Sequence, residues 1–67
     1  MEPDRKLATA TLQALITLLR IEEKRLVEVL TFAELPERRT QAEAGLERVR
    51  EKIDASAAQL AGLEHES

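Results

Sequence analysis

The tripeptide Leu35-Pro36-Glu37 decides the fold, because it interrupts a chain whose other residues favour helix from end to end. Pro36 disfavours helical geometry at Leu35 and has no N–H to donate to a helix that arrives from the N-terminal side. The same proline suits the first turn of a new helix, and the acidic Glu37 beside it complements the helix dipole. The stretch therefore predicts two helices joined by a tight turn.

The first helix is predicted to begin near Pro3. Proline suits the first helical position, and the acidic residues on either side of it complement the helix dipole. Helix-forming residues then continue without a break to the turn. We therefore expect a helix over residues 3–34 and a turn at 35–36.

The second helix has two alternative starts. One is Pro36, and the other is Thr40, because Thr40-Gln41-Ala42-Glu43 has the pattern of a capping box. Pro36 is the preferred start, which gives a second helix over 36–63 and a frayed tail over 64–67. The whole chain, residues 1–67, is then a single all-α helical-hairpin domain.

Apolar residues in both predicted helices follow a seven-residue pattern that is typical of coiled coils. In the first helix the pattern occupies positions 12, 16, 19, 23, 26, 30 and 33, and in the second it occupies 39, 42, 46, 49, 53, 56 and 60. Facing residues of an antiparallel pair have numbers with a constant sum, and a sum of 72 brings the two sets together. Leu12 then faces Leu60, and Leu26 faces Leu46. The pattern predicts an antiparallel, coiled-coil-like pair.

Glu23 is the acidic residue on this predicted seam. One interpretation is a buried polar residue that fixes the register of the two helices, as single polar seam residues do in coiled coils. The other is a carboxylate that turns outward to reach water. The second interpretation is the one we favour.

Large apolar residues are unevenly divided between the two halves. Residues 1–35 hold eight Leu, two Ile, two Val and one Phe, whereas residues 36–67 hold three Leu, one Val and one Ile. The first helix carries a second series at coiled-coil spacing, and the second helix has too few large side chains to cover both series. This second series is Leu15, Leu18, Glu22, Arg25, Val29 and Phe32. We expect its apolar members, Leu15, Leu18, Val29 and Phe32, to be the partner-binding residues.

Chain length and cysteine content also favour association. A chain of 67 residues buries a modest core, and domains this small rely on disulfides, metals or oligomerisation. The chain has no Cys, and its single His, His65, cannot form a metal site by itself. We therefore expect self-association into a four-helix bundle, most simply as a homodimer, and/or binding to a different helical protein.

Charge and motif content argue against several functional classes. The net charge is −3 with both signs interspersed, so nucleic-acid binding is not expected. No apolar run is long enough to span a membrane, and the absence of a signal peptide predicts a cytoplasmic location. No set of residues combines a nucleophile, a base and an oxyanion site. We predict a non-enzymatic protein with no catalytic residues, no cofactor and no metal.

The layout resembles two families of small helical hairpins. The Leu-rich first helix, the Leu35-Pro36-Glu37 turn and the segment Ala57-Ala58-Gln59-Leu60-Ala61-Gly62-Leu63 resemble the co-chaperones of type III secretion needle subunits. This resemblance implies binding to a helical-repeat chaperone that shields the needle subunit. The chain is also similar to Rop-like plasmid copy-control hairpins, which implies a dimeric four-helix bundle that binds paired RNA loops. The expected function is a small assembly factor, adaptor or chaperone-like subunit, and the alternative is a Rop-like RNA-binding regulator.

Overall fold

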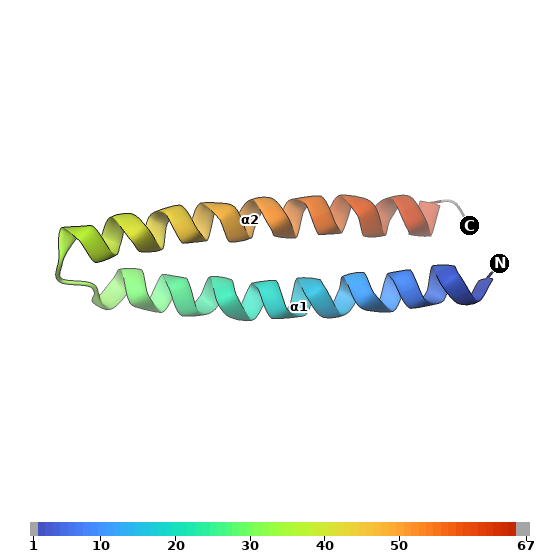
Figure 1. Cartoon of the computed structure of the whole chain (residues 1–67), viewed down its shortest axis with the longest axis horizontal. Coiled ribbons are helices and arrows are strands. Elements are labelled where there is room, and N and C mark those ends of the chain that lie inside the picture. The colour runs from blue at the N-terminus through green and yellow to red at the C-terminus, as the bar shows by residue number, and fades with distance from the viewer. Residues whose placement is uncertain (1, 66–67) are drawn as a thin grey trace.

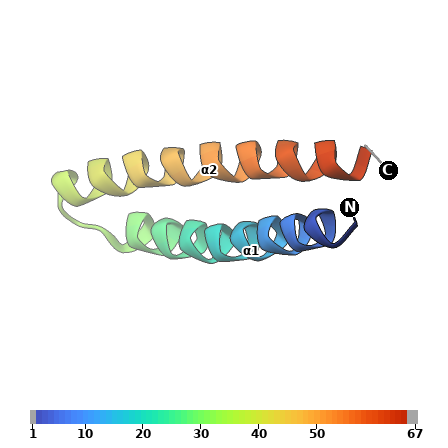
Figure 2. The ribbon, with the colours of Figure 1, turned by 45° about the vertical axis from the view of Figure 1, so that its right-hand side comes forward.

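Two long antiparallel helices make up the computed structural model, which describes residues 2–65, with side chains from residue 4 onward. Helix α1 spans Glu2–Phe32 and helix α2 spans Pro36–His65. They lie side by side along their whole length in both ribbon views (Figures 1 and 2). The hairpin measures 51 × 14 × 12 Å, so it is a thin rod with one helix on each side. The predicted all-α antiparallel hairpin is confirmed.

The connection between the helices is three residues long, from Ala33 to Leu35. The carbonyl oxygen of Leu35 accepts a hydrogen bond from the backbone N–H of Arg39 at 3.2 Å, which opens the hydrogen-bond ladder of α2. Leu35 is therefore the residue that caps α2. The predicted end of the first helix at residue 34 is wrong by two residues, because Ala33 and Glu34 belong to the connection that leads to the cap at Leu35.

Pro36, the preferred start of the second helix, is its first residue in the structure. Thr40 lies inside α2, where its hydroxyl donates a hydrogen bond to the carbonyl of Pro36 at 3.0 Å and caps nothing. At the other end, residues 64 and 65 are helical, so the predicted fraying there is wrong; residues 66 and 67 lie outside the described residues. Gly62 has no positive φ, and it therefore does not end the helix.

The predicted seam is the side of each helix that is turned toward the other. The six seam positions within α1 and Ala33, which follows it, are all half-buried, and the seam positions of α2 are buried or half-buried from Ala42 onward. Arg39 is the exception and is exposed. In the antiparallel register in which facing residue numbers add up to 72, Arg39 is level with Ala33. Ala33 follows the end of α1, so no helix lies opposite Arg39.

The hydrophobic core is small. Its buried apolar residues are Ala42, Leu46 and Val49, and no described side chain is fully buried. The chain exposes 5574 Å², whereas a compact monomer of this mass exposes roughly 4,200 Å². A hairpin alone therefore leaves a large surplus of surface in contact with water. No helix within residues 2–65 meets the length and apolarity needed to cross a lipid bilayer.

The antiparallel register is testable by crosslinking. Cysteines in place of Leu12 and Leu60, which face each other across the seam, should form a disulfide within one chain under dilute oxidation. Cysteines in place of Leu12 and Ala42, which lie near opposite ends of the rod, should not. Mass spectrometry of the oxidised monomer measures both yields. A hairpin with this register is contradicted if the first pair links no better than the second.

Gly45 weakens α2 without any steric need for glycine. A Cβ atom at this position would meet only the two Cδ atoms of Leu26, each at 3.5 Å, which is ordinary van der Waals contact. Gly45→Ala should therefore stabilise the fold by about 1 kcal/mol through helix propensity, which raises Tm by roughly 4–8 °C. The control is Gly62→Ala, where a Cβ meets nothing within 4 Å and the helix is near its end, so the gain should be smaller. A lower Tm for Gly45→Ala would show that the helices pack more closely here than the structure indicates.

Candidate partner-binding face

The second apolar series of α1 is exposed along its whole length. We call it the α1 stripe and define it as Leu15, Leu18, Glu22, Arg25, Val29 and Phe32. The exposed fractions of its apolar members are 42% for Leu15, 64% for Leu18, 47% for Val29 and 79% for Phe32. Successive helical residues are rotated by roughly 100°, so the stripe lies about a quarter-turn round α1 from the seam. Helix α2 packs on the seam and therefore cannot cover the stripe.

Three further exposed apolar residues extend this face, and the sequence analysis missed them. They are Leu7, Ile21 and Leu35, with exposed fractions of 68%, 54% and 58%. The signal that points to Ile21 is its spacing, since it follows Leu18 by three residues and precedes Arg25 by four. Val27 is also exposed, but it lies on the other side of the seam from Val29.

One line of residues along α2 lies next to the stripe. Two hollows in the surface, one near each end of the stripe, are lined by residues of both helices. A hollow of about 330 Å³ joins Val29 to Arg38 and Gln41. A larger one of about 730 Å³, near the chain ends, joins Leu7 and Thr11 to Gln59 and Gly62. The residues between them at alternating spacings of three and four complete what we call the α2 flank: Arg38, Gln41, Gly45, Arg48, Lys52, Ala55, Gln59 and Gly62.

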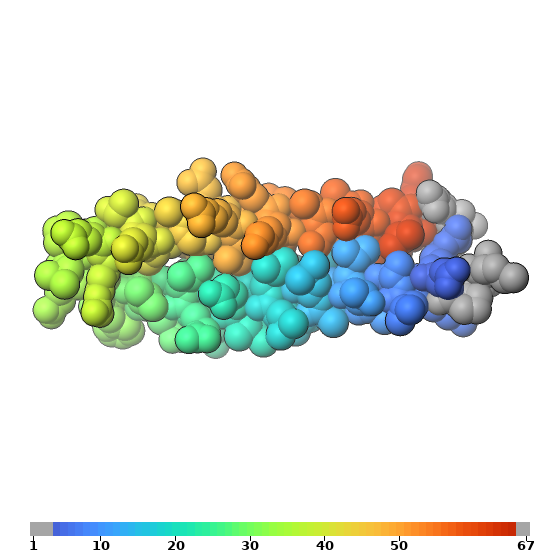
Figure 3. Space-filling model, in the orientation of Figure 1, coloured from blue at the N-terminus to red at the C-terminus, as the bar shows by residue number. Residues whose placement is uncertain are grey.

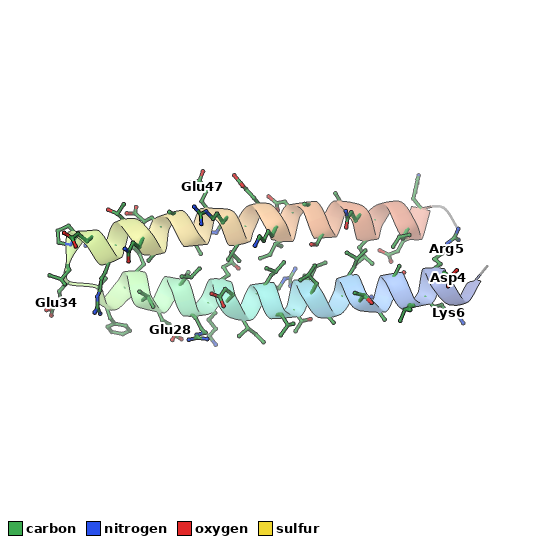
Figure 4. All side chains as sticks on the ribbon, in the orientation of Figure 1. Asp4, Arg5, Lys6, Glu28, Glu34 and Glu47 are labelled. Atoms are coloured by element: carbon green, nitrogen blue, oxygen red, sulfur yellow. The ribbon has the colours of Figure 1, made fainter. Side chains whose placement is uncertain are left out.

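The charges of α2 are divided between its two sides. The cations Arg38, Arg48 and Lys52 belong to the α2 flank, next to the α1 stripe. The opposite side holds a hollow of about 600 Å³ that is rich in acidic residues, lined by Leu30, Glu43, Leu46, Glu47, Arg50, Glu51 and Asp54. Figure 3 shows the narrow rod of two helix layers, and Figure 4 shows Glu28 and Glu47 pointing away from the helix pair on opposite sides. The hairpin thus has one apolar face with basic residues and one acidic polar face.

Glu23 belongs to the acidic side and forms an ion pair between the helices. Its carboxylate accepts a hydrogen bond from Nε of Arg50 at 3.0 Å. The side chains of Arg50 and Glu23 are 58% and 32% exposed. The carboxylate therefore turns outward from the seam, as in the interpretation favoured from the sequence.

Glu22 and Arg25 interrupt the α1 stripe at its centre. They are three residues apart, a spacing at which opposite charges on a helix can pair. Among residues 4–65, however, neither side chain makes an ion pair. Both charges stand unpaired in the middle of an exposed apolar surface, where a bound partner would meet them.

The described residues contain no metal-binding cluster of three or more His, Cys, Asp or Glu side chains. No family model, curated protein or solved structure matches the chain. The α1 stripe is thus the main functional feature among the described residues.

Glu23→Leu should stabilise the hairpin by about 1 kcal/mol. An exposed ion pair contributes less than about 1 kcal/mol, whereas a Leu between Leu19 and Leu26 would continue the apolar seam and bury part of its surface. Urea denaturation of wild type, Glu23→Leu and the control Arg50→Ala measures both effects. Arg50→Ala should lose less than about 1 kcal/mol. If Glu23→Leu is clearly less stable than wild type, the ion pair fixes the register and our interpretation is wrong.

Proposed function

We propose that this chain is a non-enzymatic protein–protein interaction module, a small assembly factor or chaperone-like subunit that binds through the α1 stripe. The observation that carries the proposal is the exposure of Leu15, Leu18, Val29 and Phe32 in a chain whose own core is formed by a few buried residues. Large exposed apolar patches mark interaction sites on soluble proteins, and the stripe has one on each side of Glu22 and Arg25.

A partner that covers the stripe would gain free energy from burial of its apolar side chains. Complete burial of one Leu or Phe side chain is worth roughly 1.5–3 kcal/mol. The stripe offers four apolar side chains, and Phe32 and Leu18 retain most of their surface for a partner to cover. Rows of apolar residues at this spacing fit a second helix laid along the first. A helical partner therefore matches the shape of the face.

The resemblance to needle-subunit co-chaperones is compatible with such a helical partner. In that case a helical-repeat chaperone would be the protein that covers the stripe. The proposed role needs no catalytic group. Burial of apolar side chains would supply most of the free energy of binding.

An RNA-binding regulator of the Rop-like kind is the alternative. The observation that favours it is that Arg25, Arg38, Arg48 and Lys52 all border the same face, although Glu22 stands among them. Binding to structured RNA would weaken steeply with added salt, because each phosphate contact releases counterions. Binding to a protein through the apolar stripe would depend much less on salt.

Substitution of Leu18 and Phe32 together by Glu should abolish partner binding. Each substitution removes apolar surface from the interface and places a charge where its desolvation is costly. The experiment is capture on the tagged full chain from extract of the native host, with quantitative mass spectrometry. We expect wild type to retain a protein at fixed stoichiometry, either another protein or untagged copies of the chain, and the Leu18/Phe32 variant to lose it.

The matched control is Thr17→Glu with Val27→Glu, which adds the same charge at exposed positions off the stripe. It should bind as wild type does, and circular dichroism should show that both variants are still helical. Equal capture by the Leu18/Phe32 variant and by wild type would contradict the proposal. Captured RNA that is released by moderate salt would favour the alternative instead.

A further inference from the structure

The α1 stripe is self-complementary when it is read against a reversed copy of itself. The numbers of two residues that face each other in an antiparallel pair add up to a constant, and for the stripe this constant is 47. Leu15 then meets Phe32, and Leu18 meets Val29. At the centre Glu22 meets Arg25, so each apolar residue faces an apolar residue and each charge faces its opposite.

We propose that the occupant of the stripe is a second copy of this chain, packed antiparallel along α1 about a twofold axis between residues 23 and 24. Glu22 of each copy pairs with Arg25 of the other, which gives two reciprocal ion pairs at the centre. This inference rests on the proposed function and names its partner. The apolar pairs supply affinity, and the charges select the orientation.

The charges distinguish this arrangement from a parallel one. In a parallel twofold dimer every residue meets its own counterpart, so Glu22 faces Glu22 and Arg25 faces Arg25. Like charges that meet at an interface are strongly disfavoured. Because neither side chain has an ion-pair partner among residues 4–65 of its own chain, both are available to the second copy.

The ends of the stripe fit the same alignment. With the sum of 47, Phe32 at the end of α1 in the second copy is level with Leu15, and the exposed Leu35 beyond it lies toward the end of the rod that holds the 730 Å³ hollow. Leu7 and Leu12 both line that hollow. The exposed Leu35 at the turn of one copy therefore meets apolar surface near the chain ends of the other.

The α2 helices also fit around this interface. Because the stripe lies about a quarter-turn from the seam, the second copy completes a four-helix arrangement in which the two α2 helices lie next to each other on the same side of the α1 pair. Arg48 is level with residue 24 in the register of the hairpin, on the side of the stripe.

The surface area is sufficient for a stable dimer. The chain exposes 5574 Å², whereas a compact monomer of its mass exposes roughly 4,200 Å². The difference between these two areas is larger than the roughly 800 Å² that each partner buries in a standard interface. A twofold interface uses the same patch on both copies and closes on itself. The product is a discrete dimer and not a filament.

Charge reversal on the purified full chain tests the pairing. Glu22→Arg places Arg against Arg, and Arg25→Glu places Glu against Glu, so each single variant should raise the dimer Kd by roughly tenfold or more. The double variant Glu22→Arg/Arg25→Glu restores opposite charges and should return the Kd to within a few-fold of wild type. Sedimentation equilibrium over a range of concentrations measures each Kd.

A mixture of the two single variants gives the sharper test. A Glu22→Arg chain and an Arg25→Glu chain present opposite charges to each other at both central contacts. The mixed dimer should therefore form at least roughly tenfold more tightly than either variant does with itself. Native mass spectrometry of the mixture, with one chain isotope-labelled, counts the three dimers. Circular dichroism checks that every variant is still helical.

Several results would overturn this inference. They are a wild-type chain that stays monomeric at high concentration, single variants that dimerise like wild type, or a double variant that is not rescued. The proposed function survives these results if the Leu18/Phe32 variant still loses a captured protein. Both proposals fail together if wild type dimerises and the Leu18/Phe32 variant dimerises equally well.

Discussion

The packing of α1 against α2 along a single seam is the contact on which the rest of the structure depends. Ala42, Leu46 and Val49 are buried against α1, and they set the antiparallel register. One helix can cover only one side of its neighbour, because side chains a quarter-turn away point past it. The exposure of the α1 stripe follows directly from this packing. The hairpin is thus stabilised on one side of α1 and left open for association on another.

The division of charge across α2 makes the two broad faces of the hairpin electrostatically different. Arg38 lines a hollow with Val29 of the stripe, and helical spacing places Arg48 and Lys52 in the same row of α2. The acidic residues of α2 line the opposite hollow. Apolar surface supplies most of the free energy of association, and charge at its centre and edges determines which partner and which orientation are accepted. In the proposed dimer the alternation of Glu22 and Arg25 has this selective role.

Most of the fold was predictable from the residues, because the decisive signals are local. The break at Pro36 and the seven-residue spacing of Leu and Ile act through backbone geometry and helix periodicity, which a sequence displays directly. The prediction failed at the helix ends. Helix α1 ends at Phe32 and not at residue 34, because Leu35 is needed as the cap of α2. The outward turn of Glu23 was favoured beforehand, but its pairing with Arg50 depends on how the helices are placed in space.

The sequence by itself determined that this chain forms two helices, that they turn at Pro36, and that α1 carries more apolar surface than α2 can cover. These properties depend on proline geometry, residue spacing and residue counts. Only the tertiary structure decided which side of α2 borders the stripe. That choice placed Arg38 beside Val29 and Gln59 beside Leu7, and it left Glu22 and Arg25 without an ion pair among the described residues. The physical reason is that a face made by two helices depends on their relative rotation, and the packed seam alone sets that rotation.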